Sequence, residues 1–264
     1  MARLMVVPDK GQLSSNAADR ITSLIEAAQE RAPAAVISLA GGSTPEALYT
    51  LLADPNRPWR NRVDWSRVQL FWGDERNVPP NSPESNFGLA NRTLIQSLRI
   101  PSANVHRIRG ELLAVDAGRQ YDAVLQSRRA QVDEALFHVT LLGIGANAHI
   151  ASLFPESPLL QHRAVQTEMG PSSRVDQWTS PSLAAGVWVP ELNQWRITLT
   201  PRAVLDSDTI LVLASGREKA HAVGAALHAP PDVSHYPAQL LRDAGDHVDW
   251  IIDESAASGL SGPL

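Results

Sequence analysis

Short runs of almost wholly apolar residues alternate with stretches of helical spacing along this chain, and that alternation most constrains its fold. A strand that is apolar on both faces needs cover on both sides, as in a parallel sheet between two layers of helices. Five runs are interpreted as such strands: AAVISLA (34–40), VQLFW (68–72), FHVTLLG (137–143), TILVLAS (209–215) and VDWIID (248–253). Four stretches have the apolar spacing of helices: 16–32, 86–98, 117–136 and 217–229. The sequence therefore predicts an α/β fold, with a doubly wound, mostly parallel sheet and helices on both faces in a Rossmann-like, three-layer arrangement.

Two further segments lie outside this alternation. GVWV (186–189) and WRITLT (195–200) predict a small additional strand pair. The segment 155–185 is rich in proline and serine, and we expect a long surface excursion there. Neither an internal repeat nor a low-complexity tract divides the chain, so residues 1–264 are expected to form a single α/β domain.

Composition excludes several classes of protein. The chain has 264 residues, of which 44% are hydrophobic and 19% charged, as expected for a packed core. The net charge is −5 without any block of like charges, so no nucleic-acid partner is expected. The absence of cysteine excludes disulfides, thiolate zinc sites and cysteine nucleophiles. The N-terminus lacks the apolar core of a signal peptide, and no apolar run approaches the roughly 18 residues of a membrane span. We therefore expect a cytoplasmic protein without a membrane partner.

Ligands of such sheets bind beyond the carboxyl ends of the strands, so the residues that follow each strand are candidates for function. The first strand is followed by two glycines and a helix start: Gly41, Gly42, Ser43, Thr44 and Pro45. Either hydroxyl residue suits the helix cap, and the proline suits the first turn. The glycines would let backbone N–H groups approach an anion at the positive end of the helix, although a well-capped helix without a ligand explains them equally well.

The second strand is followed by charged residues. Asp74, Glu75 and Arg76 lead into a proline-rich loop. A solvated charged turn is the commoner explanation of such a triplet, whereas its place at a strand end favours a functional role.

The third strand runs into the turn GIGANA (143–148) and a single histidine, His149. The turn is close to a dinucleotide fingerprint, but that fingerprint requires a long helix, and Pro155 follows too soon. NAD is therefore not expected. A lone histidine is more often a packed core residue than a catalyst, yet this position at a strand end suits a general base.

The fourth strand is followed by SGREKA, in which Lys219 lies in the first turn of a predicted helix. A cation is unfavourable at a helix N-terminus unless an anion offsets it. The position therefore indicates a phosphate or carboxylate ligand.

Together these motifs resemble the glucosamine-6-phosphate isomerase/6-phosphogluconolactonase family, and its lactonase branch in particular. They are SLAGGSTP, FWGDERNVP followed by SN, LLGIG with HIASLFP, RITLT and SGREKA, in this order, and the resemblance covers about residues 5 to 255. It implies a hydrolase that needs neither cofactor nor metal. The implied reaction opens 6-phosphoglucono-1,5-lactone to 6-phosphogluconate in the pentose phosphate pathway.

The resemblance also implies roles for individual residues. His149 would be the general base that activates water, Arg76 would stabilise charge and Asp74 would orient the substrate. Gly145 and Asn147 shape the turn that carries the base. The phosphate would be held by Gly41, Gly42, Ser43, Thr44, Arg196 and Lys219.

The chain departs from the family pattern at two places. The lactonase turn usually reads Gly-x-Asp/Glu-Gly-His, whereas Asn147 and Ala148 precede His149 here. An amide supplies no negative charge, so we expect His149 to be neutral over a wider pH range than in relatives that keep the acid. Near the C-terminus, PAQ (237–239) replaces PAS.

Two alternatives remain open. Amino-sugar-phosphate deaminases of the same family usually carry Asp-Glu-Tyr after the second strand and Asn-Glu-Pro near the histidine, whereas this chain has Asp-Glu-Arg and Leu-Phe-Pro. The other alternative is a non-catalytic sugar-phosphate sensor, like the related effector domains of transcription regulators. Those regulators carry a DNA-binding segment, for which we expect no room here because the chain begins almost directly with a strand and a helix. A monomer or small homo-oligomer is expected.

Overall fold

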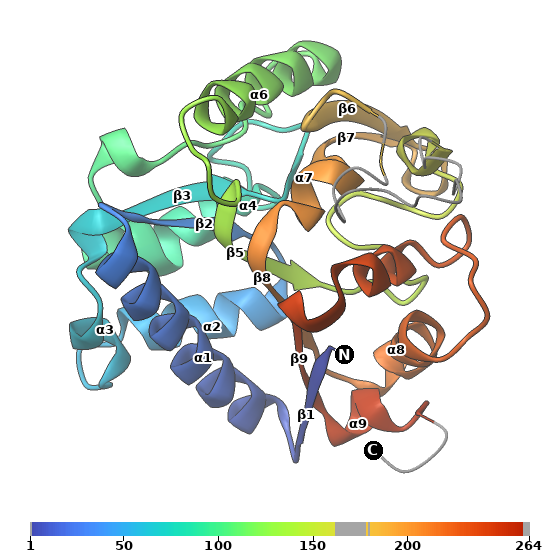
Figure 1. Ribbon diagram of the computed structural model, residues 1–264, viewed down its shortest axis with the longest axis horizontal. Coiled ribbons are helices and arrows are strands. Elements are labelled where there is room, and N and C mark those ends of the chain that lie inside the picture. Colours follow the sequence, from blue (N-terminus) through green and yellow to red (C-terminus); the bar gives the residue numbers. More distant parts are fainter. Residues whose placement is uncertain (1, 162–177, 179, 261–264) are drawn as a thin grey trace.

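The computed structural model describes residues 2–161, 178 and 180–260 and has the predicted layered architecture (Figure 1). Six parallel strands form the large sheet in the order β1-β9-β8-β5-β2-β3. They are β1 (Arg3–Val7), β2 (Ala35–Leu39), β3 (Val68–Trp72), β5 (Phe137–Gly143), β8 (Ser207–Ala214) and β9 (Val248–Asp253). All five strands predicted from apolar runs are confirmed, and β1 is added at the edge beside β9.

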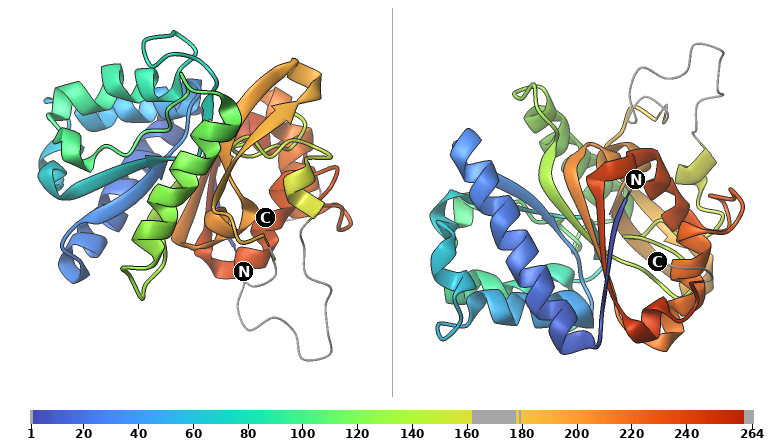
Figure 2. Two further views of the ribbon diagram at one scale, coloured as in Figure 1. Left: turned by 90° about the horizontal axis from the view of Figure 1, so that it is seen from above. Right: turned by 60° about the horizontal axis from the view of Figure 1, so that its bottom comes forward.

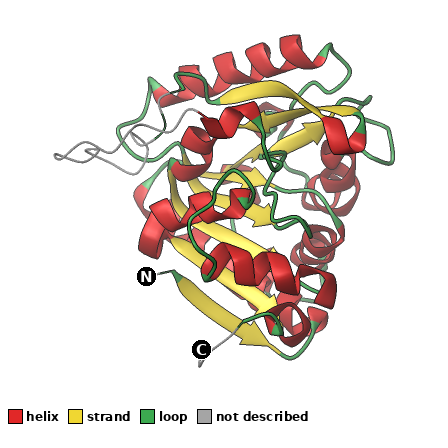
Figure 3. Cartoon of the chain, turned by 90° about the vertical axis from the view of Figure 1, so that its right-hand side faces the viewer, coloured by secondary structure: helices red, strands yellow, loops and turns green. Residues whose placement is uncertain are grey.

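Helices cover both faces of this sheet, as predicted (Figures 1 and 2). Helices α1 (Lys10–Arg31) and α2 (Ser43–Ala53) pack together on one side. Helices α6 (Ala114–Arg129), α7 (Pro201–Leu205) and α8 (Ala220–Leu227) lie on the other. Figure 3 shows the strands enclosed between these helical layers. The remaining helices and helical turns are α3 (Trp59–Arg62), η1 (Trp65–Arg67), α4 (Asn86–Ala90), η2 (Asn91–Ile95), α5 (Gln96–Leu98), η3 (Ser102–Asn104), η4 (Pro158–Gln161), η5 (Pro190–Leu192), η6 (Arg217–Lys219), η7 (Pro237–His247) and α9 (Glu254–Ala257).

Two helices start or end at other residues than predicted. Polar contacts, which the spacing of apolar residues does not reveal, set these ends. Helix α1 starts at Lys10, six residues before the predicted 16, because Asp9 caps it by accepting from the amide of Gln12 at 2.8 Å. Helix α6 ends before the predicted 136, because the chain there is drawn toward β5. The amide of Leu136 donates to Asp206 Oδ1 at 3.1 Å. The segment 86–98 is helical throughout, with a π-turn in its middle.

A second, antiparallel sheet of three strands packs against α6. The predicted pair is confirmed as β6 (Ala184–Val189) and β7 (Gln194–Leu199). The third strand, β4 (Asp74–Arg76), pairs with β7, so the interpretation of this triplet as a solvated turn is wrong. The chain crosses between the two sheets at Gly73, which donates to the carbonyl of Leu39 and accepts from the amide of Leu199, both at 2.8 Å.

The expected surface excursion at 155–185 lies largely outside the described residues. None of the described helices is both long and apolar enough to cross a lipid bilayer.

Candidate functional site

Two adjoining cavities open where the carboxyl ends of the parallel strands meet the small sheet. The larger measures about 480 Å³ and extends toward β7 and the turn between β6 and β7. The smaller measures about 230 Å³ and extends toward the glycines before α2 and toward Lys219. Four residues line both cavities: Asp74, Arg76, His149 and Ala151. A ligand that spans the two cavities would therefore pass over these four residues.

His149 lies on a tight turn directly after β5. The amide of Gly145 donates to the carbonyl of His149 at 2.8 Å, and the amide of Ala148 donates to the carbonyl of Gly145 at 2.9 Å. Ala148 has a φ of 63° and Ala151 a φ of 46°, a left-handed conformation that is uncommon for residues with a Cβ. A Cβ on Gly145 would lie 2.0 Å from Nδ1 of His149. The imidazole thus packs directly on the backbone of its own turn, which only glycine permits at residue 145.

Hydrogen bonding selects one neutral form of the His149 ring. Its Nδ1 lies 2.6 Å from Oδ1 of Asn147, and its face stacks on Phe154 with the ring centroids 4.0 Å apart. An amide oxygen can only accept, so Nδ1 carries the proton in the neutral ring. Nε2 is then left with its lone pair, as a general base requires.

The environment of His149 disfavours its charged form. Burial, followed in effect by the positive charges of Lys219, Arg196 and Arg76, lowers the pKa of His149 to about 4. The absence of charge on residue 147 predicts a wider neutral range for His149 than in relatives that keep the acid. The low pKa in this structure has other causes, namely burial and three neighbouring cations. At neutral pH the imidazole is therefore available as a proton acceptor.

Asp74 is buried at the floor shared by both cavities, and two donors fix its carboxylate. Ser152 Oγ donates to Oδ2 at 2.6 Å, and Asn86 Nδ2 donates to Oδ1 at 3.0 Å. Asn86 fits there because residue 41 has no side chain: a Cβ on Gly41 would lie 1.8 Å from Asn86 Oδ1. This glycine therefore serves the placement of Asp74 as well as any approach of a ligand.

The neighbouring carboxylate of Glu75 points away from the cavities and binds the loop that follows. It accepts from the amides of Arg76, Asn86 and Phe87 at 2.7–2.8 Å and from Ser85 Oγ at 2.9 Å. Burial raises the pKa of Glu75, whereas these hydrogen bonds lower it. Each buried donor left without its acceptor would cost about 1–3 kcal/mol. Glu75 thus holds the loop that carries Asn86.

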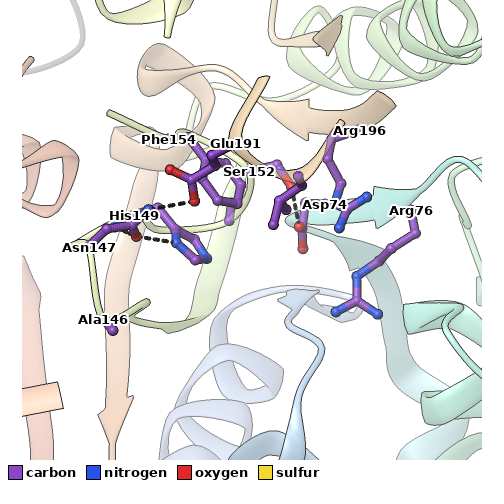
Figure 4. A pocket seen from close by; sticks show the side chains of 11 residues that line it. Asp74, Arg76, Ala146, Asn147, His149, Ser152, Phe154, Glu191 and Arg196 are labelled. Atoms are coloured by element: carbon purple, nitrogen blue, oxygen red, sulfur yellow. Dashed lines mark hydrogen bonds between the residues drawn. The ribbon is translucent and has the colours of Figure 1, made fainter. Parts of the chain in front are cut away.

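Two arginines approach the shared floor from neighbouring strands. Arg76 on β4 and Arg196 on β7 are register partners (Figure 4). Arg76 donates to the carbonyl of Glu84, and Arg196 donates to Gln194 Oε1 at 2.6 Å. Burial lowers the pKa of Arg196, and the charge of Arg76 adds to that effect. Within the described part of the chain, neither guanidinium forms an ion pair with a carboxylate, so both remain available to an anion.

The smaller cavity has the glycine turn on one side and Lys219 on the other. The predicted cap at Ser43 or Thr44 is wrong, because Gly42 is the N-cap of α2 and no side chain caps the helix. Gly42 has a φ of 100°, which a residue with a Cβ rarely adopts, and the chain needs this conformation to turn from β2 into α2. Lys219 is half-buried, and no described carboxylate pairs with its ammonium group.

Nine of the eleven residues predicted for the site line one or both cavities. They are Gly41, Gly42, Asp74, Arg76, Gly145, Asn147, His149, Arg196 and Lys219. Ser43 and Thr44 begin α2 behind the glycine turn and are not among the lining residues.

Among the lining residues that were not predicted, four have polar or aromatic side chains: Asn86, Ser152, Phe154 and Glu191. The first three lie inside the motifs that carry the resemblance and could have been found there. Glu191 lies in the turn between β6 and β7, and no pattern in the sequence marks it.

Among residues 2–161, 178 and 180–260, no three His, Asp or Glu side chains cluster in a way that could hold an ion. The cavities present three cationic side chains, which favour an anionic ligand such as a phosphate.

Gln239, where the family pattern has a serine, has a structural role. Gln239 is buried, donates to the carbonyls of Ala225 and Pro230 at 3.0 Å and accepts from the amide of Asp232 at 2.6 Å. It thus holds the loop after α8.

Comparison with known proteins agrees with this geometry. A 6-phosphogluconolactonase of Mycobacterium tuberculosis is 35% identical over 263 residues, which cover 97% of each chain. The solved 6-phosphogluconolactonase of Trypanosoma brucei has 25% identity and a TM-score of 0.78 and covers 99% of each chain. A monomeric glucosamine-6-phosphate deaminase also has this fold, with 24% identity, a TM-score of 0.74 and coverage of 97% and 99%.

The family assignment rests on most of the chain. Residues 8–250 match the family described as glucosamine-6-phosphate isomerases/6-phosphogluconolactonase. This range includes the small sheet, both cavities, all the candidate site residues and the large sheet except β1 and the end of β9. The chain belongs to the glucosamine-6-phosphate isomerase/6-phosphogluconolactonase family.

Proposed function

We propose that this protein is a 6-phosphogluconolactonase, which hydrolyses 6-phosphoglucono-1,5-lactone to 6-phosphogluconate. The observation that carries the proposal is His149, a neutral imidazole with Nε2 unprotonated, in a cavity that also holds Arg76, Arg196 and Lys219. A lactone with a remote phosphate needs a base for water, positive charge for the developing oxyanion and an anchor for the phosphate. The names of the relatives support the same reaction.

The reaction proceeds through a tetrahedral intermediate. Nε2 of His149 takes a proton from a water molecule, and the resulting hydroxide attacks the lactone carbonyl carbon. Arg76 stabilises the negative charge that develops on the carbonyl oxygen. When the intermediate collapses, the bond to the ring oxygen breaks, and the imidazolium returns its proton to that oxygen. Asp74, held by Ser152 and Asn86, accepts hydrogen bonds from sugar hydroxyls and orients the ring.

The phosphate binds at the end of the substrate that is remote from the reacting carbon. The positive end of α2, the glycines Gly41 and Gly42, and Lys219 support an anion in the smaller cavity. Arg196 adds a second cation from across the shared floor. Anchoring the phosphate converts remote binding energy into placement of the carbonyl beside the water.

A coupled assay tests this proposal. Freshly prepared lactone is supplied, and formation of 6-phosphogluconate is followed through its dehydrogenase, with spontaneous hydrolysis subtracted. Turnover at an enzymatic rate is expected. Release of ammonia from glucosamine 6-phosphate instead would assign the protein to the deaminases. Binding of 6-phosphogluconate without turnover of either compound would indicate a sensor.

Lys219→Ala should weaken the binding of substrate and product alike. Loss of an anchoring cation removes interactions that are present in the ground state and in the transition state, so KM should rise by roughly tenfold. A fall in kcat should accompany this rise, because the phosphate anchor also positions the carbonyl. Titration with 6-phosphogluconate measures the affinity directly, and an unchanged Kd would remove Lys219 from the phosphate site.

Asn147→Asp should move the acidic limb of the pH profile to higher pH by about 1 unit. The neutral form of His149 is active, so kcat/KM falls as the pH falls through its pKa, which lies at about 4 in the native protein. A carboxylate beside Nδ1 stabilises the imidazolium and raises that pKa. The pH profile of kcat/KM is measured for the native protein and for Asn147→Asp. The ionisation of the substrate phosphate contributes equally to both profiles, so the difference between them reports the change in the pKa of His149. Coincident limbs would mean that residue 147 does not act on the ring electrostatically.

A further inference from the structure

The turn between β6 and β7 brings a carboxylate to the catalytic turn. Glu191 lies in η5, at the tip of this hairpin, and its Oε1 accepts from Nδ2 of Asn147 at 2.8 Å. The other end of the same amide, Oδ1, lies 2.6 Å from Nδ1 of His149. The three side chains therefore form a continuous line from the small sheet to the imidazole (Figure 4).

The chemistry of the amide gives this line a direction. One end of an asparagine side chain only donates and the other only accepts, whereas a carboxylate such as that of Glu191 only accepts. The NH₂ group of Asn147 must then face Glu191, and its oxygen must face His149. An oxygen at that place requires a proton on Nδ1, and the lone pair of the neutral ring is then on Nε2.

The reversed amide would have the opposite effect. Its oxygen would face the carboxylate of Glu191, with like partial charges in contact. Its NH₂ group would face Nδ1 of His149 and would favour the ring form that is protonated on Nε2. That form has no lone pair directed at a water molecule, so it cannot act as the base. An aspartate at residue 147, as in the usual family turn, has two equivalent acceptor oxygens and needs no such orientation.

We propose that Glu191 is a positioning residue, which orients the amide of Asn147 and through it keeps His149 in the tautomer with an unprotonated Nε2. This inference rests on the proposed function for its catalytic consequence. It assigns a role to the hairpin of the small sheet, and it explains how an asparagine works at this place. Glu191 does not contact the reacting atoms.

Glu191 can be replaced without endangering the fold. Its side chain is exposed, and η5 is closed by a backbone bond from the amide of Asn193 to the carbonyl of Pro190. An altered activity in its variants can therefore be assigned to the site, and thermal unfolding checks that assumption.

The experiment combines substitutions at residues 191 and 147, with kcat measured at pH 8, where His149 is neutral in every form. Glu191→Ala should lower kcat roughly 10–100-fold, the usual cost of losing a group that orients a functional histidine. Glu191→Gln removes the same charge but keeps an acceptor, so its kcat should stay closer to that of the native protein. In the Asn147→Asp background, Glu191 faces a second carboxylate instead of an amide donor, so Glu191→Ala should not lower kcat.

A spectroscopic readout separates this inference from the proposed function. Long-range ¹H–¹⁵N correlation spectra, assigned with His149→Ala, report which ring nitrogen carries the proton. The native protein should have it on Nδ1, and Glu191→Ala should populate the form protonated on Nε2. An unchanged tautomer in Glu191→Ala would overturn the inference, as would equal losses in both backgrounds or a Glu191→Gln variant as impaired as Glu191→Ala. If the native protein does not hydrolyse the lactone, the proposed function fails, while the spectra still test the orientation.

Discussion

His149→Ala should lower kcat for lactone hydrolysis by roughly 10²–10⁴, the usual contribution of a positioned general base. The imidazole is the group in the two cavities whose pKa, lowered to about 4, leaves it neutral and able to accept a proton at pH 7. The cations and the glycine turn are unaffected, so residual activity from charge stabilisation and binding should remain above the rate in water. The coupled assay at saturating lactone measures the loss.

Binding provides the control for this variant. The phosphate anchor lies on other elements, so Kd for 6-phosphogluconate should change by less than about threefold in His149→Ala. Loss of kcat with retained binding would identify His149 as a group that acts in the transition state. Full activity in the variant would remove His149 from the mechanism.

Gly145→Ala should disable the site without unfolding the protein. The new Cβ would lie 2.0 Å from Nδ1 and 2.1 Å from Cε1 of His149, so the ring must move. A side chain can rotate away at little cost in stability, but the displaced ring loses the bond to Asn147 and the stack on Phe154. A misplacement of about 1 Å can cost about 10² in rate, so kcat should fall by that order.

Gly73→Ala is a matched control for this substitution. Gly73 also follows a strand of the large sheet, but a Cβ there would meet only ordinary contacts, the nearest at 3.5 Å. Its kcat should stay within about threefold of the native value. Equal kcat values for Gly145→Ala and Gly73→Ala would show that the close packing of His149 on its turn does not contribute to catalysis.

The large sheet could be predicted because its strands are buried on both faces. Each of the five runs is apolar throughout, and a pattern of that kind needs no knowledge of the partners. Strand β4 could not be predicted in this way, because it is three residues long and consists of Asp74, Glu75 and Arg76. The carboxylates of Asp74 and Glu75 are tolerated there because the following loop around Asn86 supplies donors, as does Ser152 from a distant part of the sequence.

The same distinction between local pattern and distant contact applies to the site residues. The positions of His149, Gly42 and Lys219 follow from the rule that ligands bind at the carboxyl ends of parallel strands. The role of Asn147 could not be predicted from the sequence, because it depends on a hydrogen bond to Glu191, which lies beside the other sheet. From the sequence, Asn147 is predicted to act through the loss of a charge, whereas in the structure its amide oxygen takes the acceptor position beside the ring.

The pairing of Arg76 with Arg196 links occupancy of the site to the persistence of the folded chain. Two like charges on adjacent strands repel each other, and burial strengthens that repulsion. Any anion that binds between them relieves it, so part of the favourable free energy of binding is relief of strain already present in the protein. An anion bound between the two arginines should therefore enlarge the folded population, so that fewer molecules open to proteases.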